Sequence, residues 1–316
     1  MKAIGVDLGG TKLNIGVVDN EGNFEIEERS LTLSNWPEMR ETIVNACISL
    51  IEKHDDIKAV GIGAAGMISL DGHVVYSPNV PAFNVDEHID IKGELEKVIG
   101  IPVVVDNDNN CSGYCEYRFG AAKGMKNVLN VGLGTGIGGA LILDGKIYRG
   151  NDGYAFDIGH FIMDVNGEVC ACGQIGCFET LGSGTTLGRI ARKHVEAGED
   201  PELLEYVDGD ITKIQGTHVY AALKDNPDSC KNIMQEFGDN IGLGIASLEN
   251  ILNFGVCVIS GGVSEIGEPL IELVRAKYKL HAQGSDRREL PQILLAKYTS
   301  NAGVLGAGAL ALDSLG

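Results

Sequence analysis

The stretch Val6-Asp-Leu-Gly-Gly-Thr11, followed by the apolar run Leu13 to Val18, decides the fold because a later part of the chain repeats it. The echo is Val131-Gly-Leu-Gly-Thr135, followed by Gly138-Gly-Ala-Leu-Ile-Leu143. Each copy is an apolar strand, a turn of small residues that contains Thr, and a second apolar strand. Two such hairpins can also arise from high glycine content alone. A period of about 125 residues favours two similar domains over a solenoid, and we expect them to face each other across a cleft.

The composition is that of a folded protein of about two domains. The chain has 316 residues, and roughly 150 residues per domain is typical. It contains 44 glycines but only 8 prolines, so it lacks the mixture of Pro, Gly and Ser that is typical of disordered chains. Many of these glycines must therefore be at positive φ or in close backbone contact. The 25 basic and 44 acidic residues give a net charge of -19, which counts against a surface that grips nucleic acid or an anionic membrane.

The pattern of apolar residues predicts an α/β fold. Ala3 to Leu8 and Leu13 to Val18 alternate as a hairpin. The runs Ala59 to Ala64 and Val103 to Asp106, apolar except for the final Asp106, are typical of buried parallel strands. Arg40 to His54 has the spacing of an amphipathic helix. The order of these elements predicts an α/β domain that ends near residue 115.

The domain boundaries follow from these elements. We expect a small α/β domain over residues 1–115 together with about 300–316, and a large α/β domain over 116–299. Tyr298 to Leu312 is predicted to be a helix of small residues that packs closely.

Nothing in the sequence predicts export or membrane insertion. Lys2 is followed directly by a strand, so we expect no signal peptide. The longest apolar stretch, Val128 to Leu143, is interrupted by Asn130, Thr135 and several glycines and is not expected to span a bilayer. The eight cysteines are then expected to be reduced, and a tight cluster of them is more typical of a metal site than of disulfides. We expect a cytoplasmic protein.

Three glycine-rich turns are candidate phosphate sites. The first offers backbone N–H groups, a hydroxyl, an ammonium group and a carboxylate that can hold Mg²⁺ through water; its residues are Asp7, Gly9, Gly10, Thr11 and Lys12. The alternative is a tight hairpin turn with a surface lysine. The other two turns contribute Gly134, Thr135 and Gly136, and Gly261 and Gly262. The second turn also matches the G-x-G-x-x-G pattern of dinucleotide-binding folds, but that pattern requires a helix to follow, and here a strand follows Gly139. The turns therefore favour a nucleotide held in the cleft.

The most specific pattern is a set of three cysteines and one histidine. His160, Cys170, Cys172 and Cys177 lie within eighteen residues, which matches a closed tetrahedral zinc site. Four protein ligands leave no open position, so this zinc is predicted to be structural. The alternative is that cytosolic thiols merely cluster.

Polar residues follow the buried strand that ends near Val105. Ligands of open α/β sheets bind beyond the carboxyl ends of the strands, so the run from Asp106 to Asn110 is well placed to line a ligand site. A carboxylate there can accept a hydroxyl proton as phosphoryl transfer begins. The alternative is that Asp108 or Asn110 caps the next helix.

Taken together, these motifs resemble the ROK family of sugar kinases over essentially the whole chain. The resemblance rests on Asp7-Leu-Gly-Gly-Thr-Lys12, Asn107-Asp108, Gly134-Thr-Gly-Ile-Gly-Gly139, Ile158-Gly-His160, the cysteine string, Glu179, Ser260-Gly-Gly262 and Asn301 to Gly308. It implies a two-domain actin-like ATPase (ribonuclease H-like) fold in which ATP, with Mg²⁺, and a hexose meet in the interdomain cleft. It also implies a structural Zn²⁺ and a homodimer or homotetramer.

The resemblance also implies roles for single residues. Asp108 would be the catalytic base, and the sugar would be bound by Gly66, Asn79, Asn107, Asp108, Asp157, His160 and Glu179. One ring nitrogen of His160 would bind zinc while the other reaches a sugar hydroxyl. The chain departs from the family at Asp157, where the family usually has Glu, and at Ala65, where it has proline.

We therefore expect an ATP-dependent hexose kinase that phosphorylates glucose at the 6-hydroxyl. N-Acetylmannosamine, N-acetylglucosamine and fructose are alternative acceptors, and the shorter Asp157 keeps a non-catalytic sugar sensor as a further alternative. The repressors of the family carry a DNA-binding region before the first phosphate motif. Here Asp7 of the first phosphate motif is only the seventh residue, so we expect no such region before it, and the net charge of -19 is unfavourable for binding DNA.

Overall fold

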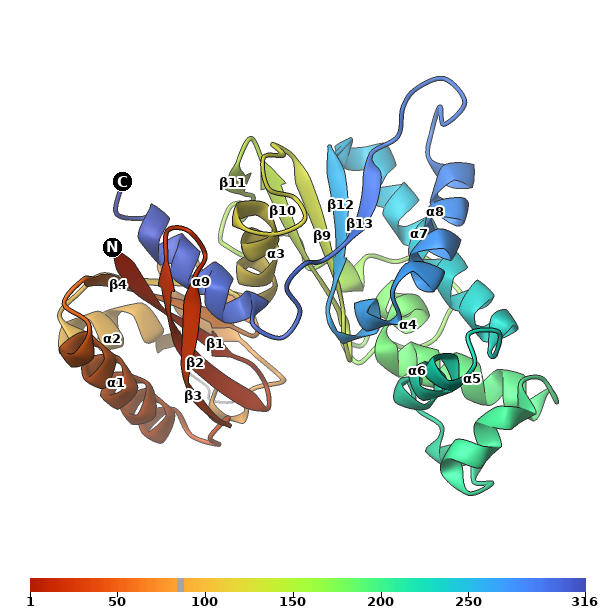
Figure 1. Ribbon diagram of the computed structural model, residues 1–316, viewed down its shortest axis with the longest axis horizontal. Helices are drawn as coiled ribbons and strands as arrows, with labels where there is room; N and C mark the ends of the chain where they lie inside the picture. Colours follow the sequence, from red (N-terminus) through yellow and green to blue (C-terminus); the bar gives the residue numbers. More distant parts are fainter. Residues whose placement is uncertain (84–87) are drawn as a thin grey trace. The chain divides into compact units, whose positions relative to one another are not determined.

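The computed structural model describes residues 1–83 and 88–316, and the chain forms two compact units (Figure 1). Unit 1 comprises residues 1–128, 140–156 and 297–316, and unit 2 comprises residues 129–139 and 157–296. The chain therefore passes between the units four times.

Unit 1 is built on a five-stranded sheet in the order β3-β2-β1-β4-β8. Its strands are β1 (Lys2–Leu8), β2 (Lys12–Asp19), β3 (Phe24–Leu31), β4 (Ile57–Ala64) and β8 (Val103–Asn107). β1 and β2 form the expected antiparallel hairpin, whereas β4 pairs parallel with both β1 and β8. The parallel strands point their carboxyl ends to one edge, where Asp7 and Asn107 lie.

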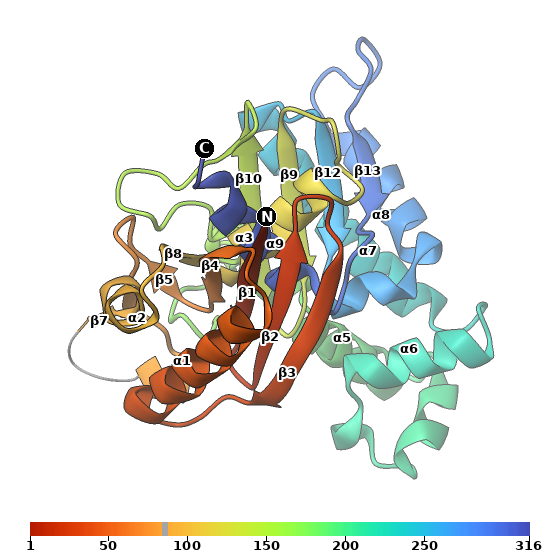
Figure 2. The same ribbon diagram turned by 60° about the vertical axis from the view of Figure 1, so that its left-hand side comes forward.

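The two faces of β1 pack against different helices because side chains alternate along a strand. Ile4, Val6 and Leu8 belong to a buried cluster with residues of α1 (Trp36–Lys53) and α2 (Ile91–Ile99) (Figure 2). α1 begins four residues before the expected start because the Asn35 side chain caps it, accepting the backbone N–H of Glu38.

The other face of the sheet packs against α9 (Ala302–Asp313), which lies beside α3 (Asp108–Arg118). A Cβ at Gly5 would lie 2.0 Å from the Val304 carbonyl oxygen, and a Cβ at Gly61 would lie 1.8 Å from that of Ala307. The helix of small residues expected near the end of the sequence therefore packs backbone against backbone with the sheet.

A three-stranded sheet, in the order β5-β6-β7, completes unit 1. It contains β5 (Met67–Ile68), β6 (His73–Tyr76) and β7 (Ile89–Asp90), with the 3-10 turn η1 (Pro81–Phe83) between the last two. This small sheet carries the segment that leads to Asn79.

The second five-stranded sheet has the order β11-β10-β9-β12-β13. Its strands are β9 (Val128–Leu133), β10 (Ile137–Leu143), β11 (Lys146–Ile147), β12 (Val256–Ser260) and β13 (Gln292–Leu295). The helices of unit 2 are α4 (Glu179–Gly182), α5 (Gly184–Glu196), α6 (Gly216–Asp225), α7 (Lys231–Leu252) and α8 (Glu268–His281). Short 3-10 turns lie at Ile158–His160, Pro201–Val207, Ile211–Lys213 and Gly262–Ile266. β9 and β10 repeat the β1–β2 arrangement of two adjacent strands joined by a glycine turn.

Among the described residues, none of the helices is both long and apolar enough to cross a membrane.

Candidate active site

The first glycine turn joins β1 to β2 and holds Asp7 in a half-buried position. The Asp7 carboxylate accepts a hydrogen bond from the Asn14 side-chain amide at 3.2 Å. Desolvation raises the pKa of Asp7 above its ordinary value, while the Asn14 bond acts in the opposite direction. The Gly9 N–H closes the turn on the Lys12 carbonyl at 3.0 Å, and Thr11 is exposed at its tip. A bound cation would favour the charged form of a carboxyl group in this position.

The same turn lies against Asn79. A Cβ at Gly10 would lie only 2.6 Å from the Asn79 carbonyl oxygen, so a larger residue would push the two segments apart. Gly66 has a φ of +124°, and a Cβ there would lie 2.5 Å from the carbonyl oxygen of Tyr76, at the end of β6. Glycine is needed at both positions by close approach, and at Gly66 by the backbone angle as well.

Asn107 ends β8 and caps α3, which begins at Asp108. The Asn107 side-chain oxygen accepts the N–H of Asn109 at 2.9 Å and that of Asn110 at 3.3 Å. The alternative interpretation, in which Asp108 or Asn110 caps this helix, is therefore wrong, because the free backbone N–H groups of the first turn point back toward the preceding residue. The Asn107 amide also donates to the Gly66 carbonyl at 3.0 Å.

Asp108 is consequently the first residue of a helix and is not needed as its cap. Its side chain is half-buried and accepts hydrogen bonds from the Asn109 N–H at 2.9 Å and the Asn109 side-chain amide at 3.0 Å. A carboxylate at a helix N-terminus is stabilised by the helix dipole in its charged form. Gly66, Asn107 and Asp108 thus form one connected group at the carboxyl end of the first sheet.

The second glycine turn, between β9 and β10, lies at the start of α5. The Gly134 carbonyl accepts the N–H of Gly184, the first residue of α5, at 2.7 Å. Gly261, with a φ of +83°, packs against the end of β9, where its Cβ would lie 2.4 Å from the Leu133 carbonyl oxygen. The two glycine motifs of unit 2, far apart in the sequence, are therefore neighbours in the fold.

The three cysteines and His160 form a compact cluster in unit 2. Their ligand atoms all lie within 4.8 Å of one another. The sulfurs of Cys172 and Cys177 are 3.6 Å apart, and the Cys170 sulfur is 3.6 Å from His160 Nδ1. With Zn–S bonds of about 2.3 Å, two sulfurs of a tetrahedral site lie about 3.8 Å apart. The spacing and chemistry of the four donors fit a structural zinc ion.

Glycines shape the loop that carries the cluster. Gly173 and Gly176 have φ values of +87° and +74°, and a Cβ at Gly176 would lie 1.5 Å from the Asp164 carbonyl oxygen. The Cys170 N–H donates to the Gln174 carbonyl at 2.8 Å. This tight turn brings Cys172 back toward the rest of the cluster.

The second ring nitrogen of His160 points away from the cysteines. Because Nδ1 faces Cys170, Nε2 lies on the opposite side of the ring, 3.8 Å from the Asp157 carboxylate. Glu179 lies on the cysteine side, with one carboxylate oxygen 3.7 Å from the Cys170 sulfur. The structure therefore brings Asp157, His160 and Glu179 together around the cluster.

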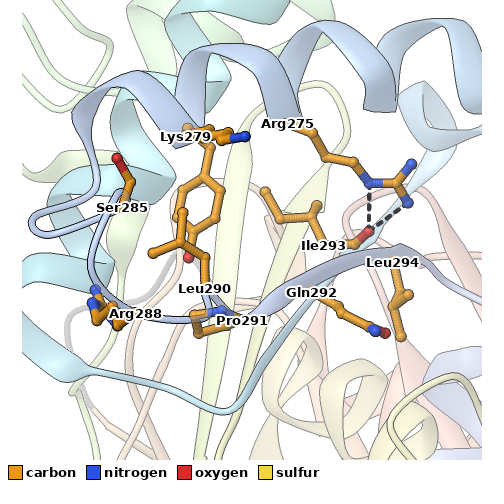
Figure 3. Close-up of a pocket in the computed structure, with 10 residues that line it drawn as sticks. Arg275, Lys279, Ser285, Arg288, Leu290, Pro291, Gln292, Ile293 and Leu294 are labelled. Carbon is orange, nitrogen blue, oxygen red and sulfur yellow. Dashed lines mark hydrogen bonds between the residues drawn. The ribbon is translucent and has the colours of Figure 1, made fainter.

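A cavity of about 640 Å³ lies elsewhere in unit 2, between α8 and the segment that leads into β13 (Figure 3). Its lining includes Arg275, Lys279 and Arg288 and none of the predicted site residues. The Arg275 guanidinium donates to the Ile293 carbonyl at 3.1 and 2.7 Å. This arginine therefore serves to tie α8 to β13.

Comparison with known proteins identifies the family. The sequence pattern of the ROK family matches residues 3–314. The chain belongs to the ROK family. It is 36% identical over 316 residues to the glucokinase of Streptomyces coelicolor, a match that covers 98% of this chain and 97% of that protein.

Solved structures agree with this assignment. The crystal structure of a ROK family glucokinase from Streptomyces griseus in complex with glucose and AMPPNP is 35% identical, with a TM-score of 0.84, and the match covers 99% of this chain and 100% of that one. The xylose repressor of Bacillus subtilis is 27% identical over 318 residues, covering 98% of this chain but 77% of the repressor. The likeness to the glucokinase structure confirms the expected α/β, actin-like ATPase fold.

Proposed function

We propose that this ROK-family sugar kinase transfers the γ-phosphoryl group of ATP to the 6-hydroxyl group of glucose, with Asp108 as the general base. The full-length similarity to glucokinases makes the protein an ATP-dependent sugar kinase. The observation that carries the finer proposal is the position of Asp108, which directly follows the cap residue Asn107 at the carboxyl end of β8. In open α/β sheets, ligands bind at this edge.

In phosphoryl transfer the protein mainly positions the two substrates and stabilises the charge of the transition state. Asp108 would accept the 6-hydroxyl proton as that oxygen attacks the γ-phosphorus and ADP leaves. Asn107 would hold the sugar beside Asp108, and its own bond to the Gly66 carbonyl fixes its amide for that task. Asn79, which lies against the first glycine turn, would contribute a further sugar contact from unit 1.

Unit 2 would supply the remaining sugar contacts. His160 Nε2 faces away from the cysteine cluster and toward Asp157, so both groups can reach hydroxyls of one sugar. Glu179 would bind the sugar with the oxygen that the backbone does not already occupy.

The glycine turns would bind the nucleotide. Asp7, Gly9, Gly10, Thr11 and Lys12 would contact the phosphates and Mg²⁺, whose charge would also lower the free energy of ionising Asp7. Gly134, Thr135 and Gly136 would bind phosphate from unit 2, together with Gly261 and Gly262. A Cβ at Gly262 would meet no atom within 4 Å among the described residues, so its backbone is open to a ligand.

Zinc is part of the proposal. His160, Cys170, Cys172 and Cys177 would hold it in a closed tetrahedral site. When bound, the ion would supply rigidity rather than reactivity, because all four positions are filled by the protein. The residues around it would then be held in place for the sugar, with His160 oriented through its ligated nitrogen.

A sugar panel tests the proposal. ADP release is measured with glucose, fructose, N-acetylglucosamine and N-acetylmannosamine, and with 6-deoxyglucose as the matched control. We expect the highest kcat/KM with glucose and no sugar-dependent ADP release with 6-deoxyglucose. A higher kcat/KM with another sugar would replace glucose as the substrate. Glucose binding with no ADP release from any sugar would instead favour the sensor, which the one-methylene-shorter Asp157 keeps as a second candidate.

A further inference from the structure

Arg149 forms an ion pair directly beside the proposed catalytic base. The arginine follows β11 and belongs to unit 1. Its Nε and Nη2 groups lie 2.8 and 2.6 Å from the same carboxylate oxygen, Oδ2 of Asp106. The Asp106 side chain is only 5% exposed, whereas that of Arg149 is 32% exposed. A buried carboxylate with a half-buried arginine as its partner is a strong, charge-assisted contact.

The other oxygen of Asp106 organises the junction of β8 and α3. Oδ1 accepts the backbone N–H of Asn107 at 2.8 Å and the side-chain amide of Asn110 at 2.8 Å. Asn110 is itself 2% exposed and lies in the first turn of α3. Asp106 therefore ties the last residue of the strand to the first turn of the helix, and Asp108 is located between these two attachment points.

Several charged side chains also lie near this junction and act on the buried thiol of Cys111. Burial raises the pKa of the Cys111 thiol, and the charges of Asp106, Asp108 and Asp7 raise it further, while Arg149 lowers it. The negative charges of three carboxylates therefore reach the buried Cys111 thiol, and the positive charge of Arg149 has the opposite effect on its pKa. Two carboxylates that share a site disfavour each other's ionised form unless a cation compensates one of them.

We propose that Arg149 is a positioning residue which, through Asp106, fixes the β8–α3 junction and compensates the second carboxylate beside Asp108. This inference rests on the proposed function, because it assigns a role relative to the base. Arg149 is 41 residues beyond Asp108 in the sequence and does not itself need to touch the sugar or the nucleotide. The pair sets the orientation of Asp108 and balances the negative charge of Asp106 next to it.

The test compares Arg149→Met with the wild-type enzyme over a range of pH. Loss of the guanidinium leaves the Asp106 charge uncompensated, so Asp108 should ionise less readily. We expect the acidic limb of the kcat profile to move upward by about one pH unit, and kcat at neutral pH to fall on the order of 10- to 100-fold. The KM for ATP should change little, because the first glycine turn is not attached to Arg149.

Three further variants separate positioning from general damage. Arg149→Lys keeps the charge and should recover part of kcat and the wild-type acidic limb. Asp106→Asn combined with Arg149→Met removes both charges and should return the acidic limb toward wild type, even if kcat stays low. Arg118→Met is the matched control, since Arg118 pairs with Asp313 at the far end of α3 and should leave the profile unchanged.

The outcomes are distinguishable from failure of the kinase proposal. An inactive wild-type enzyme would overturn the proposed function itself. An active wild type with an unmoved acidic limb and unchanged kcat in Arg149→Met would overturn the role of Arg149 alone. Equal loss of activity in Arg149→Met and Arg149→Lys, with an unmoved limb and a lowered Tm in both, would also reject positioning in favour of a purely structural contact.

Discussion

The carboxylate of Glu179 accepts a hydrogen bond from the backbone N–H of Ile137 at 3.0 Å. This bond joins the cysteine cluster to the second glycine turn, because the other oxygen of Glu179 lies 3.7 Å from the Cys170 sulfur. A Cβ at Gly136 would lie 2.1 Å from the same carboxylate, so a larger residue there would push the Glu179 side chain away from the turn. A residue predicted to bind sugar therefore also supports the turn that is proposed to bind phosphate.

Glu179→Ala should raise the KM values for both glucose and ATP. The sugar loses a contact, and the Ile137 N–H loses its acceptor, so the glycine turn is no longer held in one conformation. We expect each KM to rise about tenfold, corresponding to the roughly 1–2 kcal/mol of a charge-assisted hydrogen bond. Steady-state kinetics with one substrate varied at a time measure both effects.

Glu168→Ala is the matched control for this variant. Glu168 also lies on the cysteine-bearing loop, but its exposed side chain pairs with Arg189 and with no other charged group in the described part of the chain. Both KM values should stay at the wild-type level. A change in the glucose KM alone in Glu179→Ala would show that the bond to Ile137 does not support the nucleotide turn.

Asp108→Asn should abolish most turnover and keep glucose binding. An amide has nearly the same shape as the carboxylate but cannot accept the hydroxyl proton, and general bases contribute roughly 10²- to 10⁴-fold to rate. The kcat should fall by that factor while the glucose Kd from calorimetry changes less than about threefold. Asp56→Asn, a surface substitution in the same unit, controls for general effects. Comparable turnover in Asp108→Asn would move the role of base to another group.

Strands, helices and the cysteine cluster could be predicted from the sequence because each depends on residues that are close together along the chain. Alternation along Ile4, Val6 and Leu8 is enough to predict a strand with one face in the core. The spacing of the cysteines after His160 predicted a cluster that the fold does assemble. The small residues of α9 predicted the close packing that Gly5 and Gly61 now explain.

Contacts between distant segments could not be predicted in the same way. Arg149 and Asp106 are 43 residues apart, and no periodicity or motif marks them as a pair. Glu179 and Ile137 meet only because the sheet and the cysteine loop fold together. Even the cap of α3 was ambiguous, because Asn107, Asp108 and Asn110 are all good capping residues and only the backbone path selects one.

Removal of zinc should weaken unit 2 and glucose binding together. Cys177→Ala removes a buried ligand, and we expect the zinc content to fall from one ion per chain to near zero, with a lower Tm and a higher glucose KM. Cys257→Ala is the control, because Cys257 is buried in β12 and lies outside the cluster. Elemental analysis and thermal unfolding measure the two effects. Full zinc content in Cys177→Ala would rule out the proposed ligand set.

Phe156 carries backbone strain next to the proposed sugar residue Asp157. Its φ is +78°, in the left-handed region that bulky residues avoid. Phe156→Gly and Phe156→Ala remove the same ring, so the difference between them isolates the backbone. Glycine adopts this angle without the penalty that a Cβ brings, and we expect the glycine variant to be more stable than the alanine variant by about 1 kcal/mol.

Denaturant unfolding of the two Phe156 variants, compared at equal m-values, gives this difference directly. Glucose KM supplies a second readout, because Phe156 sets the direction in which the chain enters Asp157. If the strain serves to aim Asp157, the glycine variant should be the more stable protein and yet the weaker binder of glucose, since the freed backbone no longer holds one orientation. Equal stability of the two variants would mean that the strain at Phe156 is no larger than the extra unfolded-state entropy of glycine, about 0.5–1 kcal/mol.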